Sequence, residues 1–171
     1  MKRLVVLLVL GAVGLGFGVV ATGADASITR TVTTDDYGYS ETETCGFELD
    51  WTIQGSFKDT FYYNTSGQLV KLIESPFGGP LTVTVTNPKN GNTATTQSDA
   101  LVTVATFNPD GSLATVSHSG IDAHMVMPGA GPILVQVGTV AYDAQGNILR
   151  IGGPHQYISG DLAGFCAAMA G

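Results

Sequence analysis

Hydrophobic and polar positions alternate with a period of two along most of this chain. The stretch LTVTVT at 81–86 is the clearest case, because its aliphatic residues would face one side of a strand and its threonines the other. FELDWTI at 47–53 repeats the pattern, with its aromatic and aliphatic residues on one face. Between Cys45 and His155 such stretches recur and are separated by glycines. This organisation predicts a series of β-strands, each with one apolar and one polar face.

A recurring turn connects the predicted strands. YNTSGQL (63–69), FNPDGSL (107–113) and YDAQGNI (142–148) share an aromatic residue, Asn or Asp, two variable positions, glycine, one variable position and an aliphatic residue. This order is typical of a type I turn followed by a left-handed glycine that forms a bulge. The geometry predicts aromatic to aliphatic pairs across each hairpin, namely Tyr63 with Leu69, Phe107 with Leu113, and Tyr142 with Ile148.

Consecutive hairpins favour an all-β antiparallel meander. We expect it to close as a barrel of about eight strands, lipocalin-like or allene-oxide-cyclase-like, because closure removes exposed strand edges. A β-sandwich is the alternative. The stretch SGDLAGFCAAMA at 159–170 predicts a short C-terminal helix, capped by Ser159 or Asp161, with Leu162, Phe165 and Met169 on one face.

The beginning of the chain has the order of a secretory signal peptide. Lys2 and Arg3 precede about 17 apolar residues and the small-residue sequence ATGADA, so we expect cleavage before Ser27. An uncleaved membrane anchor is the alternative, although about 17 residues is the low end of what spans a bilayer. The predicted regions are a signal peptide at 1–26, a polar acidic arm at 27–44 and a β-barrel domain with its C-terminal helix at 45–171. The mature protein is expected to be secreted and extracellular.

The exported part of the chain is strongly acidic. Lys2 and Arg3 are two of the seven basic residues, and Asp25 is one of the fourteen acids, so five basic residues face thirteen acids after cleavage. A net charge near −8 repels phosphate backbones, and we expect neither nucleic acid nor, after signal cleavage, a membrane as partner. Six acids lie between Asp35 and Asp50, which indicates a solvated arm, with a weak cation site as the alternative. The oligomeric state stays open.

Cys45 and Cys166 are the two cysteines of the chain, and both lie in the exported part. In an oxidising compartment an even pair predicts a disulfide, here closing a loop of about 120 residues. Cysteines this far apart in sequence do not have the spacing of a metal site. We expect no metal and no cofactor.

The segment SHSGIDAH at 117–124 contains two of the three histidines with an aspartate between them. A tight turn at 119–120, or a bulge at Gly120, points His118 and His124 to opposite faces. A straight strand separates them by about 20 Å at roughly 3.3 Å per residue. A single ion therefore cannot bind both histidines. The candidate polar site consists of the residues that remain, Asp122, His124, His155 and Gln156; polar residues beside a hairpin and a histidine that satisfies local backbone groups are the structural alternatives.

An apolar candidate site comes from Met125, Met127 and Phe77. With the neighbouring PGAGP (128–132) and PFGGP (76–80), these side chains could line the mouth of a cavity, because methionine adapts to varied ligands. Ordinary core packing is the alternative. The sequence has no nucleophile elbow, Walker loop or HExxH pattern, and catalytic residues therefore stay unknown.

Several motifs resemble a family of small secreted β-barrel proteins from actinobacteria, which have a signal peptide and one terminal disulfide. They are CGF (45–47), TNPKNG (86–91), AYDAQGNIL (141–149), GPHQ (153–156) and GDLAGFCAAMA (160–170). The resemblance covers nearly all of the mature chain and implies a fold and a compartment. The family has no assigned activity, so no catalytic residue follows from it.

These expectations lead to three hypotheses of function. The first is a secreted β-barrel that binds a small apolar ligand in its interior or at its mouth. The second is a barrel enzyme that steers a reactive ligand, of the cyclase or dirigent type, and it rests on architecture alone. The third is a cell-surface interaction protein that uses the threonine-rich strand faces and the acidic arm.

Overall fold

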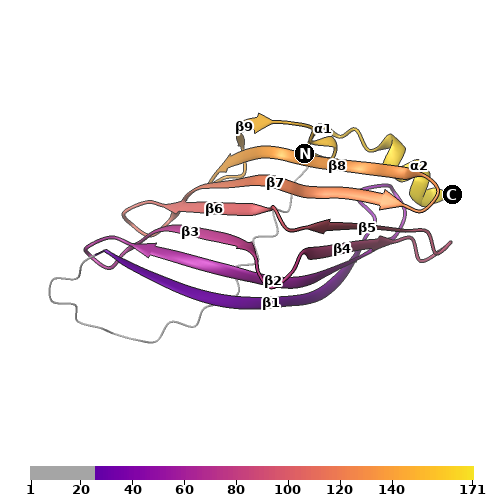
Figure 1. Ribbon diagram of the computed structural model, residues 1–171. Helices are drawn as coiled ribbons and strands as arrows, with labels where there is room; N and C mark the ends of the chain where they lie inside the picture. Colours follow the sequence, from indigo (N-terminus) through magenta and orange to yellow (C-terminus); the bar gives the residue numbers. More distant parts are fainter. Residues whose placement is uncertain (1–25) are drawn as a thin grey trace.

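The computed structural model describes residues 26–171 (Figure 1). The predicted signal peptide lies outside the described residues except for its last position. Nine strands form one antiparallel sheet, and two short helices follow them. The strands are β1 (Ser27–Glu41), β2 (Leu49–Tyr63), β3 (Leu69–Pro76), β4 (Leu81–Thr86), β5 (Thr93–Ser98), β6 (Val102–Phe107), β7 (Leu113–Met127), β8 (Gly131–Asp143) and β9 (Ile148–Gly152), and the helices are α1 (Gln156–Ser159) and α2 (Ala163–Ala170). The all-β antiparallel class and the short C-terminal helix are confirmed.

Two long strands, β2 and β7, organise the sheet. On one edge β2 pairs with the whole of β1, and on the other it pairs with β3 near its C-terminal end and with β4 near its N-terminal end. β7 pairs with β8 on one edge, and with β6 and β5 on the other. Figure 1 shows β3 and β4 end to end, and β6 and β5 end to end, between these two long strands.

The closure of the sheet differs from the expected barrel of about eight strands. The pairings form a ring of six strands, β2, β3, β6, β7, β5 and β4, in which a single pair, Thr95 with Val126, joins β5 to β7. β1 pairs with β2, and β9 pairs with β8, so both are edge strands outside the ring. The reason is that two positions in the sheet, between β2 and β7, are each occupied by two short strands placed end to end. The connection 77–80 separates β3 from β4, and the connection 99–101 separates β5 from β6. The ring of six strands therefore runs around these two connections within one curved sheet.

The acidic segment expected to form an arm, with at most a short edge strand, is the fifteen-residue strand β1. Its threonines and tyrosines suit a pleated surface, and polar side chains pair across to β2. Thr34 and Ser56 hydroxyls lie 3.0 Å apart, and the Gln54 amide donates to Asp36 at 3.2 Å. Several acids of this segment therefore stand on a strand of the sheet.

The three hairpin turns have the predicted geometry. Tyr63 pairs with Leu69, Phe107 with Leu113 and Tyr142 with Ile148, each beside a register shift. Gly67, Gly111 and Gly146 have φ angles of 75°, 84° and 81°. In the first turn, Asn64 Oδ1 accepts hydrogen bonds from two backbone N–H groups, at 2.9 and 3.0 Å. Local side-chain chemistry therefore sets the register of these hairpins.

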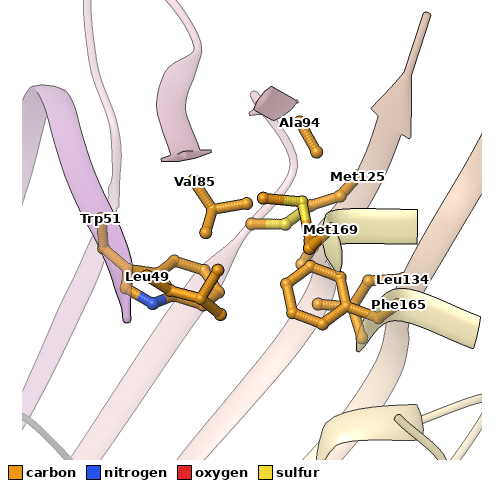
Figure 2. Packing of buried hydrophobic residues seen from close by; sticks show 9 residues of the cluster. Leu49, Trp51, Val85, Ala94, Met125, Leu134, Phe165 and Met169 are labelled. Atoms are coloured by element: carbon orange, nitrogen blue, oxygen red, sulfur yellow. The ribbon is translucent and has the colours of Figure 1, made fainter. Parts of the chain in front are cut away.

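The main hydrophobic core lies between one face of the sheet and α2. Figure 2 shows Phe165 and Met169 of the helix among Leu49, Met125 and Leu134 of the strands. The predicted disulfide Cys45–Cys166 is present and ties the connection before β2 to this helix. The N-cap of α2 is Leu162 and makes no side-chain capping bond, so the expected caps Ser159 and Asp161 are wrong. Within residues 26–171, no helix is long and apolar enough to cross a membrane.

Candidate functional site

The sheet face that contacts α2, which we call the inner face, also contains a line of polar side chains. Residues directly opposite each other on neighbouring strands share a face, and Asp59 shares the parity of the core residues Leu49 and Trp51 on β2. One such line, the polar row, runs from β1 to β7 and consists of Thr31, Asp59, Glu74, Thr103 and His118. Beyond β7 the same line continues into two apolar residues, Val140 on β8 and Ile151 on β9.

Asp59 and Glu74 stand directly opposite each other in this row, and we call them the carboxyl pair. Asp59 is 8 % exposed. Its Oδ2 accepts long hydrogen bonds from the Thr31 and Thr33 hydroxyls, at 3.5 and 3.4 Å, whereas its Oδ1 is buried without a hydrogen-bond partner. A buried acceptor in this state costs about 1–3 kcal/mol. The free lone pairs therefore mark a place where a donor would be stabilising.

Burial changes the acidity of both members of the carboxyl pair. It raises the pKa of Glu74 to about 7, and the negative charges of Asp59 and Asp35 add to this effect. Burial also raises the pKa of Asp59, while the hydrogen bonds from Thr33 and Thr31 act in the opposite direction. Neighbouring carboxylates resist simultaneous ionisation, so the pair retains a proton close to neutral pH.

Basic side chains of the same strands lie on the opposite, outer face. Lys58 and Arg30 are adjacent in sequence to Asp59 and Thr31, and alternation along a strand turns them away from the polar row. Lys71 is opposite Tyr62, and its Nζ lies 4.3 Å from the centre of that ring. The inner face of β1, β2 and β3 therefore concentrates negative charge without a neighbouring cation on these strands.

An apolar row lies beside the polar row on the inner face. It runs through directly opposite positions on β2, β3, β6, β7 and β8, which are Phe61, Leu72, Ala105, Val116 and Tyr142. Ala105, Val116 and Tyr142 are buried, and the other two are partly exposed. The carboxyl pair is thus bordered by apolar surface, which gives this face an amphiphilic character.

His118 occupies the polar row on β7. Its Nδ1 lies 3.1 Å from the Thr103 hydroxyl, and its ring meets the Tyr142 ring edge-on with centres 6.2 Å apart. Burial lowers the pKa of His118, and the carboxylate of Asp122 opposes that effect. Partial desolvation by the surrounding protein also raises the pKa of Asp122, although its side chain keeps access to solvent. The charges of His118 and His155 oppose that rise. His118 and His155 therefore both lie close enough to Asp122 to interact electrostatically.

The segment 117–124 forms part of one continuous strand with a bulge at Asp122. The register passes from Ile121 opposite Val137 directly to Ala123 opposite Gln136, so Asp122 has no partner of its own. Asp122 interacts electrostatically with His118, while His124 faces an outer groove with Val126. The two histidines point apart as the spacing predicted. Asp122 interacts with His118, whereas the sequence analysis grouped Asp122 with His124.

His155 and Gln156 connect the end of the chain to β8. His155 is 7 % exposed, its Nε2 lies 3.2 Å from the Gly152 carbonyl, and its Nδ1 is buried without a partner. Gln156 Oε1 accepts a hydrogen bond from the Val135 N–H at 2.6 Å. In return, Gln136 on β8 accepts one from the Tyr157 N–H at 3.0 Å. Gln156 thus positions α1, and His155 stands opposite Gln136 of β8, close enough to Asp122 to interact electrostatically.

The candidate apolar residues do not gather at one place. Met125 is buried in the core against α2, and Met127 packs against the same cluster. Phe77 is 48 % exposed in the connection after β3. A shallow groove of about 460 Å³ lies between β5 and β7 and is lined by His124, Val126 and Pro128, among others. This groove is on the outer face, away from the polar row.

Sequence reasoning missed the carboxyl pair and His118 as members of a site. The signal was present in the strand parity, because Asp59 lies between Phe57 and Phe61 on the apolar face of its strand. Glu74 similarly follows Leu72 by two positions. An acid at an inward position is uncommon, since burial of an unpaired charge is costly, and such acids are candidates for function.

No family model, curated protein or solved structure matches this chain. The resemblance to small secreted actinobacterial proteins therefore stays a prediction. Among residues 26–171, no group of three or more His, Cys, Asp or Glu side chains could hold a metal ion. The chemistry of this face has to be inferred from the geometry of its own side chains.

We expect Glu74→Gln to increase stability, and to do so more at pH 8 than at pH 4. The pKa of Glu74 rises from 4.5 to about 7 on folding, so its stabilising contribution is complete below pH 4.5 and is lost as pH rises through 7. The variant lacks this loss. Urea unfolding at pH 4, 6 and 8 should show a difference from wild type that grows with pH and levels off above 7. Glu48→Gln, at an exposed carboxylate, is the control, and a pH-independent difference for Glu74→Gln would contradict the assignment.

Proposed function

We propose that this protein is a secreted binding protein that holds a small amphiphilic molecule on the inner face of its sheet. The observation that carries the proposal is the carboxyl pair with its unpartnered Asp59 Oδ1, next to the apolar row. A ligand that donates a hydrogen bond to this oxygen removes the cost of the buried acceptor. Its apolar part would cover the partly exposed side chains Phe61 and Leu72.

Two further features support this proposal. The disulfide is consistent with an oxidising compartment such as the extracellular space, in which a secreted carrier would act. The apolar row continues from Phe61 and Leu72 across three further strands and offers a ligand apolar contact along its length. In this proposal the sheet encloses the apolar part of the ligand as a barrel would.

Mass spectrometry of the natively purified protein tests the proposal. We expect a small molecule with an apolar portion and a hydrogen-bond-donating head group to co-purify. Leu72→Gln on the inner face should reduce the recovered amount at least about tenfold, because polar substitution removes apolar contact. Ile73→Gln, the adjacent residue on the outer face, is the matched control and should retain the ligand. Equal loss in both variants, or no co-purifying molecule from the native source, would count against the proposal.

A second candidate, a barrel-type enzyme that steers a reactive ligand, is favoured by one observation. Glu74 and His118 lie on one row and are separated by one intervening strand, β6, which places their backbones roughly 10 Å apart. A carboxyl group with a raised pKa and an imidazole with a lowered pKa can act as general acid and general base at neutral pH. Turnover of the co-purifying molecule, lost in His118→Gln while binding persists, would distinguish the enzyme from the carrier.

A further inference from the structure

We infer that the head group bound by this protein is a primary ammonium group, held between Asp59 and Glu74 on the inner face. This inference rests on the proposed function and adds the chemical class of the ligand. It uses the carboxyl pair, the unpartnered oxygen of Asp59 and the separation of charges between the two faces of the sheet.

The distribution of charge favours a cation. Asp35, Asp59 and Glu74 interact with one another on the inner side of β1, β2 and β3. The basic side chains of these strands, Arg30, Lys58 and Lys71, project from the outer face. A ligand carboxylate or phosphate would meet like charge at this place, whereas an ammonium group would be attracted.

The hydrogen-bonding capacity of the pair specifies an ammonium group that has N–H donors. Asp59 is more than nine-tenths buried, its Oδ2 is engaged by Thr31 and Thr33, and its Oδ1 is free. A primary ammonium has three N–H groups, so it can donate to Asp59 Oδ1 and to the Glu74 carboxylate together. A quaternary ammonium has the same charge without a donor, and would leave Asp59 Oδ1 unsatisfied.

An alcohol offers a weaker match to the same two groups. Its hydroxyl can donate a single hydrogen bond and brings no charge to offset the repulsion between the two carboxylates. The ammonium group satisfies the unpartnered oxygen and also stabilises the ionised form of both acids. The geometry therefore ranks primary ammonium above hydroxyl, and both above carboxylate.

Binding of an ammonium group should be linked to proton release. The titratable groups facing Glu74 are Asp59 on β2 and Asp35 and Tyr37 on β1, with His118 farther along the polar row. The cation takes the place of the proton that the carboxyl pair retains, so binding at pH 6 releases a proton and binding at pH 8 does not. Affinity should rise about tenfold per pH unit below 7 and level off above it.

Four probes that share an eight-carbon chain and differ in head group test this inference. Their binding to the disulfide-intact mature chain is measured by isothermal titration calorimetry at pH 8. They are octylamine, octan-1-ol, octanoate and octyltrimethylammonium. Octylamine should bind at least about tenfold more tightly than octanol or the quaternary amine, and octanoate most weakly. Titrations of octylamine at pH 6 in two buffers of different ionisation enthalpy should show the released proton.

Variants with matched charge changes complete the test. Asp59→Asn and Glu74→Gln should each weaken octylamine binding at least about tenfold while octanol binding changes little. Asp36→Asn removes an acid from the outer face of β1 and should alter neither affinity. If octanol and octylamine bind equally and Glu74→Gln changes neither, the ammonium assignment is wrong and the proposed binding function stands. If none of the four probes binds, the proposed function itself fails.

Discussion

Replacement of both cysteines, Cys45→Ala with Cys166→Ala, should lower the free energy of unfolding by about 4–5 kcal/mol. The bond links residues 121 positions apart, so it removes much of the conformational freedom of the unfolded chain. It also joins the connection before β2 to α2, whose Phe165 and Met169 fill the core. We expect the variant to fold, because this packing persists, and to unfold at lower urea concentration.

The double replacement is preferable to either single one, because a single substitution leaves a free thiol that can form intermolecular bonds. Comparison of oxidised and reduced wild type gives an independent measure of the same bond. Urea unfolding followed by Trp51 fluorescence suits both experiments, since Trp51 stacks on Phe165 with ring centres 6.2 Å apart. A loss of stability below about 1 kcal/mol would contradict the chain-entropy account of this disulfide.

The second large effect is expected at Gly120, next to the bulge on β7. Its φ angle is 107°, and a Cβ atom there would lie 1.9 Å from the backbone oxygen of Ala100. Gly120→Ala should therefore destabilise the fold by more than about 3 kcal/mol or prevent folding, because the obstacle is backbone and the left-handed conformation adds strain. The change would also disturb the neighbouring bulge at Asp122.

Gly111 provides a matched control for this substitution. Its φ angle is 84°, also in the left-handed region, but a Cβ atom there would meet nothing within 4 Å. Gly111→Ala should cost about 1–2 kcal/mol, which is the conformational penalty alone. Thermal or urea unfolding of the two variants separates that penalty from the steric one. Similar losses at both positions would show that the close approach of Ala100 to Gly120 is unimportant.

The polar row could be predicted only in part. Asp59 with Glu74, and Thr103 with His118, lie within hairpins whose registers follow from their turns. The contact of Glu74 with Thr103 depends on the pairing of β3 with β6, which belong to different hairpins. Parity could place Asp59 and Glu74 on the inward faces of their own strands, but the pairing of β3 with β6, and the bulge at Asp122, decide which residues stand opposite. A shift of register by one residue would move every side chain to the other face. His118 was accordingly absent from the candidate polar site, because its neighbours across β6 and β8 follow from strand pairing.

The sequence by itself determined the series of β-strands between Cys45 and His155, the three hairpin registers and the disulfide. These features are local, or depend on the presence of two cysteines: an Asn or Asp oxygen binds backbone groups within four residues, and glycine permits the turn. The tertiary structure alone decided that the strands form one curved sheet around an interrupted centre, that β1 runs along β2, and that Glu74 stands opposite Thr103 where β3 pairs with β6. Those outcomes come from pairing and burial between segments far apart in the chain, which local residue preferences do not encode.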